Sequence, residues 1–225
     1  MSARTGHRFR NRSEAGAALG RVLQAYAGRS DVVVLALPRG GVPVAAEVAR
    51  ALGATLEVML VRKLGLPGQE EFAIGALAEG GVTVLQPGAL GQFGMTQERL
   101  DEVVRRENAE LARRRDLYRG APLPALQGKV AILVDDGLAT GHTMRAAVAA
   151  ARKGAPARLV VAVPVGARDS CDGLRQEADE VVCLHIPEPF YAVGFWYEDF
   201  GQTSDQEVIE LLRQAGHGQD RSDGK

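Results

Sequence analysis

Short apolar runs alternate with segments of helical periodicity along most of this chain. The runs are rich in β-branched residues, a pattern typical of strands that are covered on both faces. They lie at Val32–Leu37, Leu56–Val61, Val130–Val134, Arg158–Val163 and Val181–Leu184. Helical spacing follows the first and third runs, near Val44–Leu52 and His142–Lys153. These β-α-β units predict an α/β fold: a parallel five-stranded core sheet with helices on both faces.

The segments outside this repeat predict a hairpin and further helices. Ile74–Ala78 and Val82–Leu85 flank a Glu-Gly-Gly turn and predict a hairpin. A capping-box pattern at Asn11–Glu14 opens a helix that runs to about residue 27. We interpret the charged segment 96–119 as a solvated helix rather than an anion-binding surface, because its opposite charges sit one turn apart. The last helix is expected at Asp205–Gln214.

These elements fit a single domain over residues 1–225. Its core would cover about residues 30–185. A small hood would be built from the two ends of the chain, at about 1–28 and 186–215, and a polar tail at 216–225 is expected to be disordered.

Composition and charge exclude several classes of protein. Of the 225 residues, 46% are hydrophobic, and the formal net charge is −1. This balance argues against nucleic acid or a membrane surface as a partner held by bulk charge. No apolar run approaches the roughly 20 residues that span a bilayer, and no apolar segment follows the basic N-terminus as in a secretory signal. Two cysteines outside any metal-binding pattern fit a reducing compartment, so we expect a cytoplasmic protein.

Two glycine-containing loops follow predicted strands and therefore meet at the edge of the sheet where ligands bind. Gly137–Thr143 leads into a helix, so its backbone N–H groups and the helix N-terminus can cradle a phosphate. It lacks the Walker A pattern, which disfavours hydrolysis of nucleoside triphosphates. Leu37–Pro43 places Arg39 beside Gly40 and Gly41, where an anion can approach the backbone.

Asp135 and Asp136 lie between these loops, directly after a buried strand. Two carboxylates beside a phosphate site repel the ligand unless they bind hydroxyl groups or a cation. A ribose offers a pair of hydroxyl donors, and Mg²⁺ would neutralise both the acids and the phosphate. The pattern indicates a ligand with a phosphate at one end, a second anion at the other, and a diol between them.

The segment Ile132-Leu-Val-Asp-Asp-Gly-Leu-Ala-Thr-Gly-His-Thr143 closely resembles the signature with which type I phosphoribosyltransferases bind phosphoribosyl pyrophosphate (PRPP). Leu37-Pro-Arg-Gly-Gly41 is similar to the pyrophosphate loop of that family. The resemblance covers about residues 30–185. It implies a Mg²⁺-dependent transfer of the phosphoribosyl group from PRPP to a nitrogenous base or related small molecule, as in purine or pyrimidine salvage, by a protein that is commonly a homodimer.

The resemblance also implies residue roles. Asp135 and Asp136 would hold the ribose hydroxyls, directly or through Mg²⁺, and are the expected catalytic and metal-binding residues together with the catalytic Lys63. Arg39, Gly40, Gly41 and Arg62 would bind pyrophosphate. The 5′-phosphate would be bound by Gly137, Leu138, Ala139, Thr140, Gly141, His142 and Thr143, although His142 by itself is more simply an exposed residue at a helix start. A cis peptide bond, frequent in the family's pyrophosphate loop, is expected at Pro38–Arg39 or Arg39–Gly40.

Three features concern the lid and the acceptor. The resemblance places a mobile lid at 62–71, where glycine and proline occur. Ala139 stands where transferases for 6-oxopurines usually carry a third acid, so hypoxanthine and guanine are disfavoured; the loop is closer to that of adenine-type enzymes and competence-associated proteins. Phe195, Trp196 and Tyr197 of the hood either stack on a planar base or form a structural cluster.

Two other functions remain open. A PRPP-binding regulatory protein would use the same loops without turnover, although such proteins usually add a DNA-binding domain. A hydrolase or phosphotransfer protein can also carry paired acids at a strand end, but the Thr-Gly-x-Thr loop and the separate Pro-Arg-Gly-Gly loop argue against it.

Overall fold

A five-stranded parallel sheet forms the centre of the computed structural model, which describes residues 8–86, 88–120 and 123–219. The strand order is β2-β1-β6-β7-β8, and every pair is parallel. This confirms the predicted fold class. The strands are β1 (Val32–Ala36), β2 (Thr55–Val58), β6 (Val130–Val134), β7 (Arg158–Val165) and β8 (Glu180–His185).

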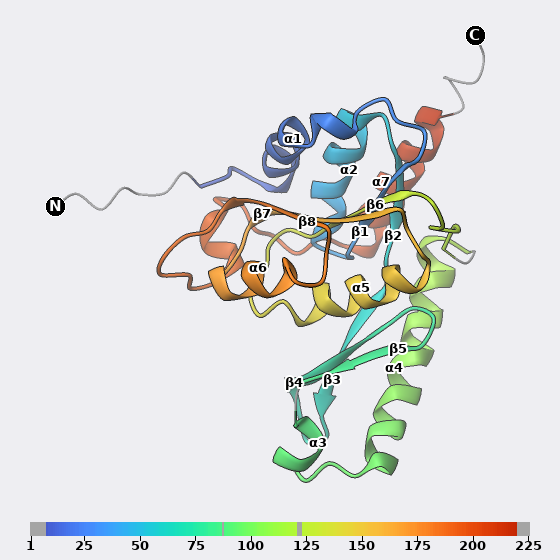
Figure 1. Ribbon diagram of the computed structural model, residues 1–225, viewed down its shortest axis with the longest axis vertical. Coiled ribbons are helices and arrows are strands. Elements are labelled where there is room, and N and C mark those ends of the chain that lie inside the picture. Colours follow the sequence, from blue (N-terminus) through green and yellow to red (C-terminus); the bar gives the residue numbers. More distant parts are fainter. Residues whose placement is uncertain (1–7, 87, 121–122, 220–225) are drawn as a thin grey trace, which may run out of the picture.

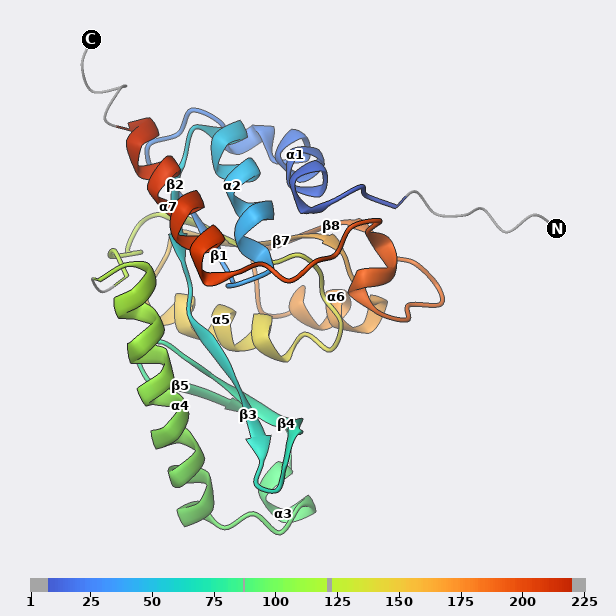
Figure 2. The ribbon, with the colours of Figure 1, turned by 180° about the vertical axis from the view of Figure 1, so that it is seen from behind.

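Helices cover both faces of this sheet because its strands are apolar on both sides (Figures 1 and 2). Val32, Val34 and Ala36 belong to the core beneath α1 (Arg12–Val22), α2 (Gly41–Leu52) and α7 (Asp205–Gln219). Val33 and Leu35 face α5 (His142–Lys153) and α6 (Arg168–Leu174). The alternation follows from the two-residue period of a strand.

A second, antiparallel sheet extends below the first as an arm (Figure 1). It consists of β3 (Val61–Leu66), β4 (Gln69–Ala78) and β5 (Val82–Leu85), so the predicted hairpin at 74–85 is confirmed. Helices α3 (Ala89–Gln92) and α4 (Gln97–Tyr118) complete the arm. Small residues on the sheet, among them Ala76 and Ala78, pack against Ala146 of α5 and join the arm to the core.

Two predictions about the start of the arm are wrong. The apolar run at 56–61 was expected to be one strand, but β2 ends at Val58 and Val61 begins β3 in the other sheet. The segment 62–71 was expected to be a loop, but it forms β3, a turn and the start of β4, with Gly68 at φ 81° in the turn. Pairing with β4 supplies the hydrogen bonds that a loop would have lacked.

The two ends of the chain meet in the hood. Phe9 forms a parallel bridge with Tyr197, and its amide donates to the carbonyl oxygen of Trp196 over 2.8 Å. The short 3₁₀ helix η2 (Val193–Trp196) lies beside this junction, and a second one, η1 (Gln24–Tyr26), follows α1. Helix α7 continues to Gln219, past its expected end at Gln214. The basic N-terminus at 1–7 and the tail at 220–225 lie outside the described residues.

None of the helices in the described part of the chain is both long and apolar enough to cross a membrane. The longest, α4, carries charge on most of its turns.

Candidate active site

Asp135 and Asp136 lie at the carboxyl end of β6, against the loop that follows β1. The amide of Leu37 donates to the carbonyl oxygen of Val134 over 2.9 Å, which keeps the two chain segments in register beyond the strands. A Cβ atom on Gly40 would lie 2.1 Å from Asp136 Oδ2. Only glycine therefore permits the loop to approach the Asp136 carboxylate this closely. The peptide bond between Pro38 and Arg39 is cis, which confirms that prediction.

The two carboxyl groups are held in an environment that disfavours their charge. Burial, and then the neighbouring carboxylate of Asp136, raises the pKa of Asp135 well above its usual value. Burial also raises the pKa of Asp136, while Arg12 opposes the rise. Asp135 Oδ1 accepts the amide N–H of Asp136 over 2.8 Å, whereas Asp135 Oδ2 and Asp136 Oδ1 accept no hydrogen bond from the described residues. The pair thus retains acceptors for a ligand.

This donor set fits Mg²⁺ in one particular way. No group of three or more His, Cys, Asp or Glu side chains in the described part of the chain could hold a metal ion. Mg²⁺ is commonly bound by one or two carboxylates, with waters and substrate phosphates as its other ligands. Asp135 and Asp136 can supply that share only, so a phosphate-bearing ligand would have to complete the coordination.

Arg12 and Tyr197 hold Asp136 from the hood side. Arg12 Nε lies 2.8 Å from Asp136 Oδ2, with 12% and 15% of the two side chains exposed. The Tyr197 hydroxyl donates to the carbonyl oxygen of Asp136 over 2.6 Å. Sequence reasoning missed both contacts. A basic residue in the first turn of a helix opposes the helix dipole, and this was the one signal that Arg12 has another role.

Replacing Arg12 with alanine should destabilise the protein in a pH-dependent way. The ion pair favours ionised Asp136, so its loss should lower the free energy of unfolding by about 1–3 kcal/mol above the pKa of Asp136. The loss should shrink as pH falls through that pKa, since a protonated Asp136 no longer needs Arg12. Urea titrations between pH 5 and 8 measure this.

The exposed pair of Arg29 and Asp31 supplies the control for Arg12. Arg29→Ala should leave the free energy of unfolding almost unchanged at every pH, because solvent screens a surface pair. A pH-independent loss in the Arg12→Ala protein would mean that Arg12 supports packing and not the charge of Asp136.

The predicted phosphate loop is anchored at both ends and exposed in the middle. Leu138 is buried, and its amide donates to the carbonyl oxygen of Val165 over 2.8 Å. Gly141 takes φ 76° as the N-cap of α5, a conformation that glycine adopts readily. Ser170 Oγ donates to the carbonyl oxygen of Ala139 over 2.6 Å. The anchors leave Ala139 and Thr140 exposed, directly before a helix N-terminus that can receive an anion.

His142 and Thr143, at the start of α5, line different pockets. Thr143 lines a large cavity between the core and the arm, together with Pro38 and Lys63. His142 lines a separate small pocket with Arg145 and Gln86. Burial, and then the charges of Arg145 and Lys63, lowers the pKa of His142. His142 is therefore a half-buried neutral residue near neutral pH rather than the exposed one expected.

The predicted pyrophosphate residues come from two directions. Arg62 and Lys63 lie on β3 and reach the cavity that also contains Pro38 and Thr143. Lys63 is close enough to Asp135 to lower its pKa slightly against the effect of burial. Arg39 instead points toward α7, with its Nη1 3.6 Å from Asp205 Oδ1.

The three hood aromatics do not share one surface. Phe195 is 63% exposed and packs against Tyr191, with 5.7 Å between the ring centroids. Trp196 has a buried indole N–H without a partner in the described residues. Tyr197 is 1% exposed and stacks with Phe200. Of the three, Phe195 is the most exposed, Trp196 is half-buried, and Tyr197 is not free to stack on a ligand.

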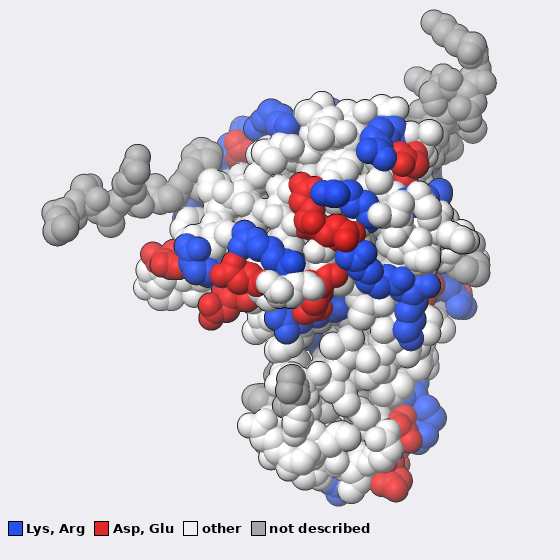
Figure 3. All heavy atoms as spheres, viewed as in Figure 1, with Lys and Arg blue, Asp and Glu red and all other residues white. Residues whose placement is uncertain are grey.

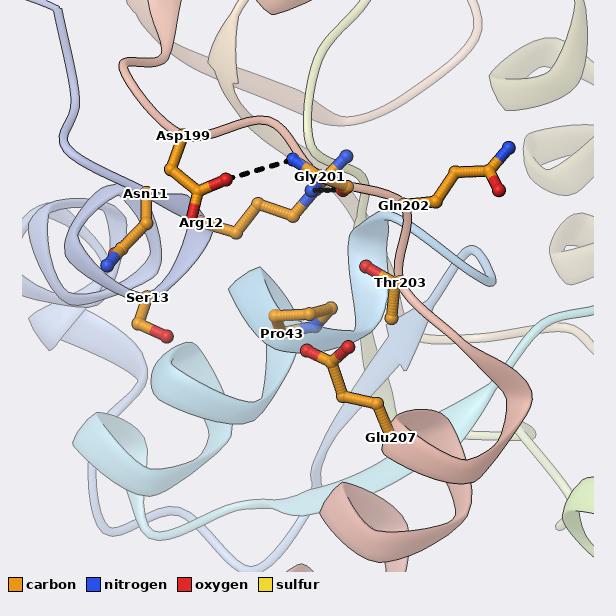
Figure 4. A pocket seen from close by; sticks show the side chains of 9 residues that line it. All are labelled: Asn11, Arg12, Ser13, Pro43, Asp199, Gly201, Gln202, Thr203 and Glu207. Carbon is orange, nitrogen blue, oxygen red and sulfur yellow. Dashed lines mark hydrogen bonds between the residues drawn. The ribbon is translucent and has the colours of Figure 1, made fainter.

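Beside Arg12, a polar pocket of about 340 Å³ lies between the start of α1 and the segment 199–207 (Figure 4). Both ends of the chain contribute to it. Its lining consists of Asn11, Arg12, Ser13, Pro43, Asp199, Gly201, Gln202, Thr203 and Glu207. Arg12 crosses it and donates through Nη1 to the carbonyl oxygen of Gly201 over 2.7 Å. Since Arg12 also contacts Asp136, the pocket lies one side chain away from the paired acids.

Comparison with known proteins places this geometry in a family. The model of the phosphoribosyl transferase domain matches residues 12–198. A Mycobacterium tuberculosis protein named "Putative phosphoribosyl transferase" is 46% identical over 208 residues, which are 92% of this chain and 47% of that protein. The chain thus spans about half the length of this curated relative.

The chain is also similar to solved structures. A crystal structure of the protein TT1426 from Thermus thermophilus is 45% identical, with a TM-score of 0.76, and the match covers 92% of this chain and 98% of that one. The protein AQ2163 from Aquifex aeolicus shares the fold at 12% identity, with a TM-score of 0.51 over 89% of this chain and 84% of that one.

Proposed function

This chain belongs to the phosphoribosyl transferase domain family, and on that premise we propose that it transfers the phosphoribosyl group of PRPP to a nitrogen-containing acceptor and releases pyrophosphate. One observation carries the proposal: the half-buried pair Asp135 and Asp136 lies between a glycine-rich loop and the loop of Arg39 and Gly40 at a single sheet edge. The unused carboxylate oxygens suit the two adjacent hydroxyls of a ribose. The loop before α5 suits its 5′-phosphate.

In the proposed reaction, the lone pair of an acceptor nitrogen forms a bond to C1 of the ribose. The bond between C1 and the pyrophosphate oxygen breaks, and its electron pair leaves with pyrophosphate. A proton on the acceptor nitrogen passes to the departing pyrophosphate or to water. Positive charge grows on the ribose ring in the transition state, where ionised Asp135 and Asp136 stabilise it electrostatically. Lys63 and Arg62 would stabilise the negative charge on the leaving group.

Magnesium is part of the proposal. Asp135 and Asp136 would hold Mg²⁺ together with oxygens of PRPP, and the ion would neutralise part of the pyrophosphate charge. Binding of the ion requires both carboxylates to be ionised. It should therefore release protons, because the raised pKa of Asp135 favours the protonated form in the free protein.

The polar pocket beside Arg12 is the proposed acceptor site. Glu207 and Thr203 project into it from the start of α7 and the preceding loop (Figure 4). Neither side chain has a hydrogen-bond partner among the described residues, so both can receive a ligand. A lining of this kind suits an acceptor that offers N–H donors and is recognised by hydrogen bonds rather than by stacking.

Replacing Glu207 with glutamine should raise KM for the acceptor about tenfold or more, the effect of one lost charge-assisted hydrogen bond. KM for PRPP should stay unchanged, because Glu207 lies on the far side of Arg12. Gln206→Ala, an exposed neighbour on the same helix, is the matched control. Initial rates at varied concentrations of each substrate separate the two constants, and an equal rise in both would remove Glu207 from the acceptor site.

Turnover with a panel of purines, pyrimidines and other nitrogenous acceptors tests the proposed function. With PRPP and Mg²⁺, one class of acceptor should produce pyrophosphate and the matching ribonucleotide in equal amounts. PRPP binding without product across the panel would favour a PRPP-binding regulatory protein. A protein that does not bind PRPP at all would refute the proposal.

A further inference from the structure

A cavity of about 490 Å³ lies between the ligand loops of the core and the arm. The core contributes Pro38 and Thr143, one from each loop. The remaining lining comes from the arm, from β3 and from α4: Val61, Arg62, Lys63, Gly65, Arg106, Glu107 and Arg114. The cavity therefore begins at the proposed PRPP site and ends on a helix that sequence reasoning left without a function.

The charge of this lining is strongly positive. Four cations, Arg62, Lys63, Arg106 and Arg114, line the cavity with a single carboxylate, that of Glu107. Glu107 is 7% exposed. It accepts from Arg62 Nε over 2.9 Å and from Arg106 Nε over 3.1 Å. The terminal NH₂ groups of both arginines have no partner among the described residues, so Glu107 orients them without using up their donors. Figure 3 shows basic side chains running from the middle of this face toward the upper end of α4.

The position of Arg114 on α4 argues against a solvated helix. The side of α4 that packs on the protein contains Leu100, Val103, Glu107, Leu111 and Tyr118. Arg114 falls on the same stripe, since it follows Leu111 by three residues and Glu107 by seven. Its side chain is 21% exposed, against 57% for Arg113. Both arginines pair with Glu110, but only Arg114 lines the cavity.

We propose that α4 completes the pyrophosphate site, with Arg114 and Arg106 binding the pyrophosphate group of PRPP, and of the released product, alongside Arg62 and Lys63. The inference rests on the proposed function and adds residues from the inserted helix to it. Pyrophosphate presents several charged oxygens over a short distance, and guanidinium groups bind such oxygens through paired N–H donors. A ligand with a single phosphate, bound at the loop before α5, would leave these four cations without an anionic ligand.

Isothermal titration of the whole protein with Mg²⁺-pyrophosphate and, separately, with ribose 5-phosphate tests this assignment. Arg114→Ala should weaken pyrophosphate binding about tenfold or more, and Arg106→Ala should weaken it in the same direction. Ribose 5-phosphate lacks the pyrophosphate group, so its affinity should stay within about twofold. Arg113→Ala and Arg105→Ala, adjacent residues on α4 that do not line the cavity, are the matched controls and should bind both ligands like the wild type.

Three outcomes distinguish the inference from the function on which it rests. If Arg114→Ala and Arg113→Ala bind pyrophosphate equally well, or if ribose 5-phosphate is lost as much as pyrophosphate, α4 does not form the site, even where PRPP turnover is intact. Selective loss of pyrophosphate in a protein without turnover would support the site and refute the enzyme. Failure of the wild type to bind either ligand would refute both. Arg114→Lys, which keeps the charge, should be intermediate and guards against a folding defect in the alanine variant.

Discussion

A protein with Asp135→Asn should bind Mg²⁺-PRPP about 100-fold more weakly than the wild type and yet unfold at a higher temperature at pH 8. Loss of one or two charge-assisted interactions accounts for the binding defect, at about 1.5–3 kcal/mol each. The asparagine side chain can still accept the amide N–H of Asp136, as Asp135 Oδ1 does over 2.8 Å. It no longer requires a charge to be buried next to a second carboxylate, and relief of such a functional site commonly gives about 0.5–2 kcal/mol.

The pH dependence of this gain has a definite sign. Because folding raises the pKa of Asp135, the full cost of ionising this carboxyl group in the folded protein is present above the raised pKa, and it shrinks to nothing as pH falls from there to the ordinary pKa of aspartate. The advantage of Asp135→Asn should therefore be largest above the raised pKa and disappear as pH falls from that value to the ordinary pKa of aspartate. Thermal unfolding and PRPP titration at several pH values measure both effects.

Asp136→Asn is the control for this result. It should also lose PRPP binding, but without a gain in stability, because Arg12 would lose its anionic partner at 2.8 Å. If Asp135→Asn bound PRPP with wild-type affinity in the presence of Mg²⁺, the site would have to be placed elsewhere.

Adding a methyl group to Gly40 or Gly41 should damage the site through two different contacts. In Gly40→Ala, the new Cβ atom would lie 2.1 Å from Asp136 Oδ2, so the carboxylate must turn away from Arg12 and from the ligand. We expect PRPP affinity to fall about 100-fold, the equivalent of roughly two charge-assisted hydrogen bonds. The loss of stability should be smaller, because a side chain can move.

Gly41→Ala meets backbone instead of a side chain. Its Cβ atom would lie 2.8 Å from the carbonyl oxygen of Val134 and 2.9 Å from Asp135 Cα, both at the end of a central strand. This overpacking should lower the free energy of unfolding by about 1–3 kcal/mol. Chemical denaturation and PRPP titration of both variants give the two readouts.

Gly91→Ala in α3 is the matched control, since the added methyl group would have no atom within 4 Å and the φ of Gly91 is not positive. It should be neutral or slightly stabilising, as alanine favours helices. Wild-type PRPP affinity in Gly40→Ala would show that Asp136 does not need its present position.

Local signals predicted the segment from β6 to α5 almost to the residue. The apolar run ends at Val134, as expected, and α5 begins at His142 and ends at Lys153, as expected. Strand burial, the turn glycines and the helix start are all properties of neighbouring residues. Local signals did not predict the cis peptide bond in the loop after β1. That prediction came from the family resemblance alone, and the bond lies at Pro38–Arg39.

The predictions for the run 56–61 and for the segment 62–71 were wrong because, in each case, the same local sequence pattern fits two different structures. The run 56–61 is apolar throughout, apart from Glu57, and nothing in it marks the point after Val58 where the chain leaves the first sheet. Glycine and proline at 65–68 suit a mobile loop as well as the tight turn between β3 and β4 that is present. In α4, paired charges one turn apart occur on solvated helices and also on a helix whose inner stripe carries Glu107 and Arg114.

The sequence by itself determined the chemistry that two loops and a pair of acids can offer, because each of these is a run of adjacent residues with a characteristic backbone geometry. Only the tertiary structure decided what stands opposite them. Arg12 meets Asp136 across 124 positions of the chain, and Arg114 shares a cavity with Thr143 and Pro38. Such pairs depend on how helices from the ends and from the arm pack on the sheet, and the energy of that packing is spread over many apolar contacts that no local pattern records.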